Sequence, residues 1–204
     1  IALAADLHES DPTKAIECLR QAAPDMICIA GDTFERFDLK NCPCRRGEYG
    51  IFTKLLLYID DVFEWFAGER KHSSEYAYRF LREAVKIAPV YMALGNHEEY
   101  LLPKDRQVIK ETGVTLLDNA DVAAEQKSTL FCIGGLSTNP DLKWLKKFCE
   151  KEEYKILLCH HPEYYERYLK DKKLNLIFSG HAHGGQIRLP GRGIFAPGQG
   201  LFPK

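Results

Sequence analysis

The 204-residue sequence lacks a surplus of charge of either sign: 28 Lys and Arg stand against 29 Asp and Glu, for a formal net charge of -1. Binding along a nucleic acid needs an excess of Lys and Arg, so we expect no long nucleic-acid footprint. No apolar run is long enough to cross a bilayer. However, 45% of the residues are hydrophobic, which excludes an intrinsically disordered chain. A globular domain remains.

A complete set of disulfides is also missing, because the seven cysteines are an odd number. Cys28, Cys132 and Cys159 lie in apolar runs that predict buried strands, where a free cysteine behaves as a small hydrophobe. A reducing compartment is the simpler interpretation, and we expect a cytoplasmic location. Cys42 and Cys44 form a CPC triplet, but a structural zinc site needs four ligands and none cluster nearby.

Short apolar runs alternate with amphipathic stretches, which indicates an α/β architecture. We expect a single domain over 1–204, with a helical insertion at about 40–74 and with terminal segments missing. The expected strands cover 1–5, 26–30, 89–94, 114–118, 121–125, 129–134, 154–159, 174–179 and 186–189. The expected helices cover 13–23, 51–66, 75–87, 104–112, 140–150 and 163–170.

Five of the apolar strands end in residues that can bind metals. In α/β sheets the ligand crevice lies beyond the carboxyl ends of the strands, so we expect these side chains to meet at one edge. The seven candidate donors are Asp6, His8, Asp32, Asn96, His160, His181 and His183.

The spacing and chemistry of these donors predict a centre with more than one ion. Residues two apart in an extended segment point to the same side, so Asp6 and His8 are expected to bind one ion together, and His181 and His183 to point at one cluster. Imidazole and carboxylate ligands suit Zn, Fe or Mn better than Ca. Seven donors exceed the needs of one tetrahedral ion and suit two ions that share a carboxylate, as in two-metal phosphoryl chemistry.

The motifs DLH, GD, GNHE, CHHP and GHAH, in this order, resemble those of the calcineurin-like metallophosphoesterase superfamily from Asp6 to at least His183. The stretch SGHAHGGQIRLPG, with FAPGQGLFPK after it, resembles a narrower branch, the bacterial YkuE-type phosphodiesterases, which are related to UDP-2,3-diacylglucosamine hydrolase-like enzymes. The resemblance implies a metallophosphatase-like β-sandwich of two sheets flanked by helices, with the site at the carboxyl ends of the strands.

The resemblance also implies a role for each residue. Asp32 bridges two metal ions, which are Mn, Fe or Zn, and a hydroxide between the ions attacks phosphorus. His97 contacts the phosphate and protonates the leaving oxygen, so His97 and Asp32 are the expected catalytic residues. Glu98 orients His97, and His161 supports the ligands beside it. The first ion is held by Asp6, His8 and His183, and the second by Asn96, His160 and His181.

The expected function is therefore that of a dinuclear metal-dependent hydrolase of phosphate esters, with a phosphodiester favoured. The substrate is a small molecule or is linked to a lipid. A non-catalytic scaffold on the same fold and a nuclease remain the alternatives. A protein Ser/Thr phosphatase is discounted, because such enzymes carry GDYVDRG where this chain has GDTFERF.

Two segments leave a choice open. The apolar helix expected at 51–66 is a core helix or a lid that contacts a membrane, so peripheral membrane association stays an alternative. Gln186 and Arg188 either touch substrate or serve packing and solubility. Thr33 and Phe34 replace the residues that many relatives carry after the Gly-Asp pair, which predicts a change around the metal ligands. The oligomeric state is not indicated by the sequence.

Overall fold

The computed structural model describes residues 1–36, 73–182, 187–189, 192–196 and 200–201. The insertion predicted at about 40–74 lies outside the described residues except for 73 and 74, as does the helix predicted at 51–66. Cys42, Cys44, His183 and Gln186 also lie outside them.

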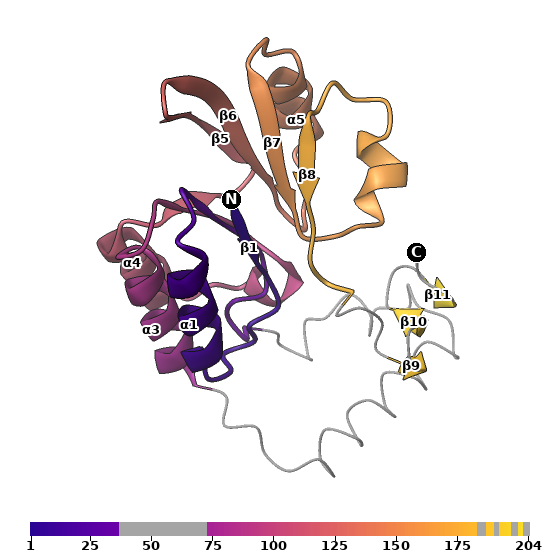
Figure 1. The fold of residues 1–204 in the computed structure, drawn as a ribbon. Helices are drawn as coiled ribbons and strands as arrows, with labels where there is room; N and C mark the ends of the chain where they lie inside the picture. Colours follow the sequence, from indigo (N-terminus) through magenta and orange to yellow (C-terminus); the bar gives the residue numbers. More distant parts are fainter. Residues whose placement is uncertain (37–72, 183–186, 190–191, 197–199, 202–204) are drawn as a thin grey trace.

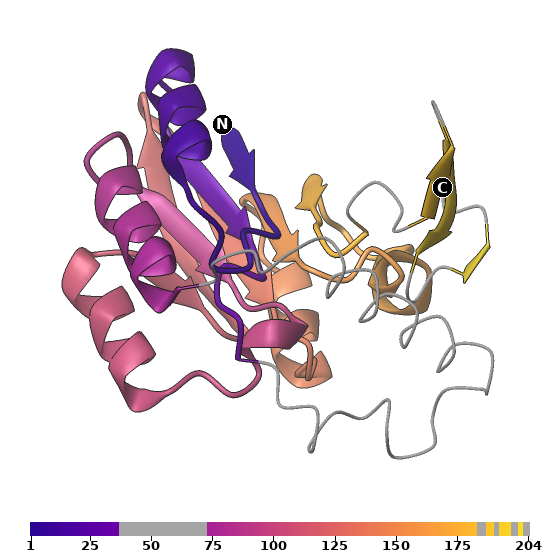
Figure 2. The same cartoon turned by 90° about the horizontal axis from the view of Figure 1, so that it is seen from below.

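The first sheet has four parallel strands in the order β1-β2-β3-β4. Three helices lie together on its outer side (Figures 1 and 2). The strands are β1 (Ala2–Ala4), β2 (Ile27–Ala30), β3 (Val90–Ala93) and β4 (Thr115–Leu117). The helices are α1 (Thr13–Ala22), α3 (Ser74–Ala84) and α4 (Pro103–Thr112), and a short 3-10 helix, η2 (Asn96–Glu98), follows β3.

The second sheet has the order β5-β6-β7-β8, with β5 antiparallel to β6 and the other pairs parallel. Its strands are β5 (Ala120–Gln126), β6 (Thr129–Leu136), β7 (Tyr154–Cys159) and β8 (Leu176–Phe178). Helix α5 (Leu142–Cys149) and the π-helix η3 (Tyr165–Leu169) pack against this sheet. A smaller antiparallel sheet contains β9 (Ile187–Leu189), β10 (Arg192–Ala196) and β11 (Gly200–Leu201).

The two sheets and the helices on their outer faces form four layers, and successive side chains along a strand pack into different layers. Ile27 and Ile29 of β2 pack toward the helices of the first sheet, whereas Cys28 between them packs into the core shared by the two sheets. In β7, Ile156 faces that shared core and Leu157 faces the cluster of α5. Successive side chains of a strand point to opposite faces, so each sheet buries both of its faces. The predicted two-sheet sandwich flanked by helices is confirmed.

The helix ends follow local chemistry more closely than the apolar periodicity. The helix expected at 75–87 begins at Ser74, where the Ser73 side chain accepts from the Glu75 backbone N–H, and it ends earlier than expected, at Ala84. The helix expected at 163–170 is a five-residue π-helix. The cysteines among the described residues, Cys18, Cys28, Cys132, Cys149 and Cys159, are free thiols.

The parallel strands deliver their carboxyl ends to one edge of the sandwich. The segments after β1, β2, β3, β7 and β8 meet there through backbone hydrogen bonds, such as those from Asp6 N to Gly31 O and from Gly180 N to His160 O, both 3.1 Å. No helix within the described part of the chain has the length and apolar character to span a bilayer.

Candidate metal centre

The loops that carry the predicted ligands have strained backbones. Asp6, His8, Asp32 and His181 have φ values of 56°, 47°, 54° and 69°, in the left-handed region that side chains other than glycine rarely adopt. The expectation that Asp6 and His8 share one extended segment is therefore wrong, because the chain turns after β1. A residue other than glycine in the left-handed region lowers the stability of the fold by about 1–3 kcal/mol. Backbone strain of this kind is concentrated at functional sites.

Two glycines let these loops approach one another closely. Gly31 has a φ of +90°, and a Cβ there would lie 2.7 Å from both Gly95 N and His160 Nδ1. A Cβ on Gly95 would lie 2.1 Å from Asp32 Oδ1. Both positions therefore require glycine, for conformation and space at Gly31 and for space at Gly95.

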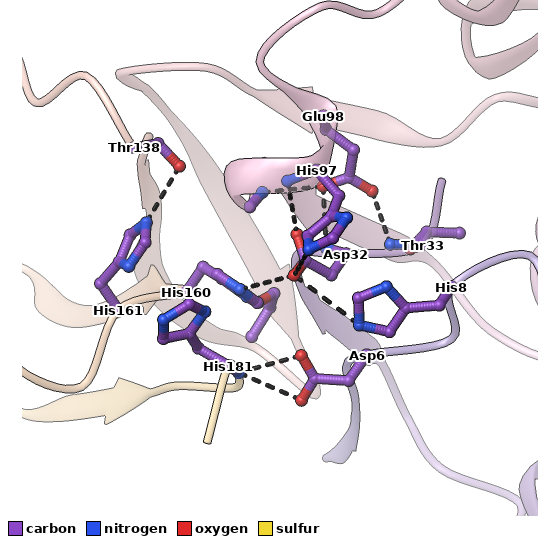
Figure 3. Close-up of polar contacts among 12 residues, drawn as sticks. Asp6, His8, Asp32, Thr33, His97, Glu98, Thr138, His160, His161 and His181 are labelled. Atoms are coloured by element: carbon purple, nitrogen blue, oxygen red, sulfur yellow. Dashed lines mark hydrogen bonds and ion pairs between the residues drawn. The ribbon is translucent and has the colours of Figure 1, made fainter. Parts of the chain in front are cut away.

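Asp32 lies at the centre of the site, 1% exposed, with three imidazoles around one carboxylate oxygen (Figure 3). Its Oδ2 lies 2.9 Å from His160 Nε2, 3.8 Å from His8 Nε2 and 3.9 Å from His97 Nε2. Burial raises the pKa of Asp32, but the imidazoles of His160, His97 and His8 lower it further, so it stays below its ordinary value. Asp32 is thus an ionised carboxylate that several elements share.

The His160 ring shows what this cluster requires. Its Nδ1 lies 2.7 Å from the carbonyl oxygen of Ala30, which can only accept, so Nδ1 carries the proton. Its Nε2 is buried and makes no hydrogen bond with good geometry to any described residue, although Asp32 Oδ2 is 2.9 Å away. Burial lowers the pKa of His160, but Asp32 and the Ala30 carbonyl raise it to about 9. A lone pair aimed at a carboxylate requires a cation, either a proton or a metal ion.

Asn96 and His181 are two further candidate donors. Asn96 Oδ1 is buried and has no hydrogen-bond partner among the described residues. The backbone N–H of His181 donates to both oxygens of Asp6, at 2.9 and 3.1 Å. Burial and the neighbouring His160 and His161 lower the pKa of His181 to about 3, which keeps its imidazole in the neutral form that binds metals.

The described residues contain three clusters of candidate ligand atoms: two of them share Asp32, and the third joins His161, Glu163 and His181. Of the two that share Asp32, the first joins it with His8 and His97, the second joins it with His160 and His181, and the ligand atoms within each lie within 4.8 Å of one another. Asp32 belongs to both of the clusters that contain it, so its carboxylate is placed where it could be shared between two ions. The described residues thus offer donors for two ions, but the first cluster contains His97 where the resemblance implies Asp6 and His183, and His183 lies outside the described residues.

Glu35, and not Glu98, contacts the ring of His97. Both oxygens of the buried Glu98 accept backbone N–H groups, from Asp32 at 2.9 Å, Thr33 at 2.6 Å, Phe34 at 3.0 Å and Gly95 at 2.7 Å. The His97 ring instead contacts Glu35 through Nδ1. The expectation that Glu98 orients His97 is corrected: Glu98 fixes the loops after β2 and β3, and Glu35 lies against the ring.

Glu35 also contacts His8, since its Oε2 lies 2.9 Å from His8 Nδ1. The rings of His8 and His97 meet edge to face with their centroids 4.7 Å apart. Burial raises the pKa of Glu35, but the two imidazoles lower it to about 2. A carboxylate on Nδ1 leaves Nε2 of each ring facing Asp32, an arrangement that orients a histidine toward a metal or substrate.

His161 lies on the other side of Asp32 from His8 (Figure 3). Its Nε2 is 3.0 Å from Thr138 Oγ1 and its Nδ1 is 3.1 Å from Glu163 Oε1. The ring stacks on Tyr164 and lies 4.7 Å from the ring of His181. These contacts fit a residue that supports the neighbouring ligands.

Sequence reasoning missed Glu35, Thr138 and Glu163. Glu35 carried one signal, a carboxylate three residues after Asp32 in GDTFERF. Thr138 carried none, because its contact with His161 joins a loop after β6 to a loop after β7.

The sandwich and its strand-end donors define an α/β protein with a candidate dinuclear metal centre. A family described as calcineurin-like phosphoesterase matches residues 1–185. The chain belongs to this family. The match covers the described segments that carry Asp32, His97 and His160.

Three relatives show how far the similarity extends. The uncharacterized metallophosphoesterase Cj0846 of Campylobacter jejuni is 30% identical over 92% of this chain and 43% of that protein. The UDP-2,3-diacylglucosamine pyrophosphatase LpxG of Chlamydia muridarum is 28% identical over 91% of this chain and 63% of that protein. The phosphodiesterase YaeI of Escherichia coli is 29% identical over 54% of this chain and 42% of that protein. The chain spans less than two thirds of the length of each of these relatives.

Proposed function

We propose that this chain hydrolyses phosphate esters, with phosphodiesters favoured, at two metal ions that Asp32 and the imidazoles around it would hold. The observation that carries the proposal is the pair of imidazole groups that share this one carboxylate. Asp6, His8 and His183 would hold the first ion, and Asn96, His160 and His181 the second. The ions, which are Mn, Fe or Zn, would supply positive charge for the phosphate and activate the attacking water.

The chain's own residues supply orientation and proton transfer. His97 would contact a phosphoryl oxygen and give a proton to the leaving oxygen, with Glu35 on its Nδ1 to fix the direction of the ring. Glu98 holds the backbone around Asp32. Burial and the neighbouring charge of Asp32 raise the pKa of Glu98 to about 7, although the backbone N–H groups that it accepts lower it. The names of YaeI and LpxG support a diester or pyrophosphate substrate, and LpxG supports a lipid-linked one.

The test compares turnover of bis-p-nitrophenyl phosphate and p-nitrophenyl phosphate after reconstitution with Mn, Fe or Zn. Asp32→Asn is the site variant, and Asp25→Asn is the matched control, because it changes an exposed carboxylate just before the other end of β2. We expect diester turnover in the wild type and in Asp25→Asn, and loss of both turnover and bound metal in Asp32→Asn. Metal-loaded wild type that cleaves neither ester would favour the scaffold interpretation.

A further inference from the structure

Arg36 follows Glu35 directly, and its side chain is held by three different segments. Its guanidinium makes a two-pronged contact with Asp105, Nε to Oδ2 at 2.7 Å and Nη2 to Oδ1 at 2.9 Å. Nη1 donates to Glu9 Oε1 at 2.6 Å, and Nη2 donates to Ser74 Oγ at 2.9 Å. The fork of an Arg matches a carboxylate in one geometry only, so these contacts fix the direction of the chain at this point.

Asp105 is buried completely in the first turn of α4 and is satisfied on both oxygens. Besides Arg36 it accepts the Tyr78 hydroxyl at 2.6 Å and the Leu102 backbone N–H at 3.0 Å. The side chains of Arg36, Glu9 and Asp105 are 12%, 7% and 0% exposed. A buried ionic network of this kind adds little net stability over an apolar core, and its best-attested use is to specify one arrangement.

The arrangement that it specifies includes the imidazoles of the centre. The backbone N–H of Arg36 donates to the carbonyl of His97 at 2.9 Å. One residue earlier, the Glu35 carboxylate contacts Nδ1 of both His8 and His97. Glu35 is partly exposed, and Arg36 Nη1 donates to its backbone carbonyl at 3.0 Å, so the anchored guanidinium also holds the Glu35 backbone.

We propose that the Arg36–Asp105 pair is a positioning device that acts through Glu35 on His8 and His97. The proposal rests on the proposed function for its kinetic readout only. It assigns a role to Asp105, Tyr78 and Arg36, none of which ends a strand or belongs to the ligand set. Loss of the pair would leave the ligands present but would free Glu35 to leave the two rings.

A double-mutant cycle separates this role from a merely structural one. The variants are Asp105→Asn, Glu35→Gln and the two combined, with kcat and KM measured on bis-p-nitrophenyl phosphate. We expect Asp105→Asn to lower kcat by about tenfold with KM changed less than about twofold, as for other groups that orient a catalytic histidine. In the Glu35→Gln background it should lower kcat no further, because the group through which it acts is already altered. If the fold-losses in kcat of the two single variants multiply in the double variant, the proposal is overturned.

Two control variants test whether a loss of stability alone lowers kcat. Ile109→Val shortens a buried side chain on the same helix without touching the network, and Glu83→Gln breaks the exposed Arg20–Glu83 contact of 2.6 Å. Both should keep the wild-type kcat. Where Asp105→Asn does not fold, Tyr78→Phe removes one hydrogen bond from Asp105 and keeps the ring that packs against Phe34.

A spectroscopic arm is independent of turnover. NMR of the full chain with Zn²⁺ added, at one fixed pH, follows the imidazole nitrogen signals of His8, His97 and His161. Asp105→Asn should shift the His8 and His97 signals and leave that of His161, which contacts Thr138 and Glu163 instead. Unchanged His8 and His97 signals would overturn the proposal. If the protein had no esterase activity, the proposed function would be wrong, but the NMR signals would still show whether Asp105 positions His8 and His97.

Discussion

Replacement of Gly95 by alanine tests the geometry of the metal centre directly. The added Cβ would lie 2.1 Å from Asp32 Oδ1 and 2.8 Å from Asp32 Cγ. Gly95 has a φ of -97°, which alanine adopts without strain, so the effect falls on the contact with Asp32. To regain an ordinary contact of about 3.4 Å, the carboxylate must move by roughly 1 Å, whereas metal ligands tolerate about 0.2 Å.

A shift of that size predicts a large loss of function with a modest loss of stability. A misplacement of about 1 Å costs on the order of 100-fold in rate, and we expect a comparable fall in metal affinity. The moved carboxylate would also weaken the hydrogen bond of 3.0 Å from His97 N to Asp32 Oδ1. Overpacking by one methyl group lowers the free energy of unfolding by about 1–3 kcal/mol, so most of the protein stays folded.

The assay is metal titration by calorimetry, together with thermal unfolding of the metal-free protein. Gly134→Ala is the matched control, because its Cβ would lie 2.9 Å from the Phe148 ring, in the core and away from the centre. This control should lose similar stability and keep its metal affinity. Wild-type metal affinity in Gly95→Ala would refute the inferred contact between Gly95 and Asp32 and the central place of that carboxylate.

Three further outcomes are expected. Saturation with Zn²⁺ at about 100 times its Kd should stabilise the fold by about 2.7 kcal/mol, and a chelator should reverse the resulting rise in Tm; an unchanged Tm contradicts a preformed site. Burial raises the pKa of Asp105, but Arg36 and Tyr78 lower it below 3.8. Its stabilisation is therefore complete above pH 3.8 and is lost as the pH falls below it, so urea titrations should show the gap between wild type and Asp105→Asn narrowing in acid. Phe148→Ala removes a fully buried ring stacked on Trp144 and should cost about 3–5 kcal/mol in denaturant unfolding, while metal content stays unchanged.

Predictions from the sequence succeeded where the physics is local. The continuous apolar run of β2 and the Gly-Asp pair after it lie within a few residues of one another, and parallel strands place their carboxyl ends at one edge of the sheet. The same reasoning failed for the conformation of Asp6 and His8, because the turn after β1 is set by hydrogen bonds to the β2 loop, such as His8 N to Asp32 O at 2.9 Å.

The sequence by itself thus determined the layered α/β architecture and the candidate donors, since both follow from strand periodicity and from residue types at strand ends. Only the tertiary structure decided that Asp32 is shared by two imidazole groups, that Glu98 holds backbone N–H groups and that Glu35 lies on His97. Glu35 and His97 are separated by 62 residues, so no local pattern brings them together. Their contact exists because packing of the helices and sheets fixes both loops at once, with Arg36 anchored on α4.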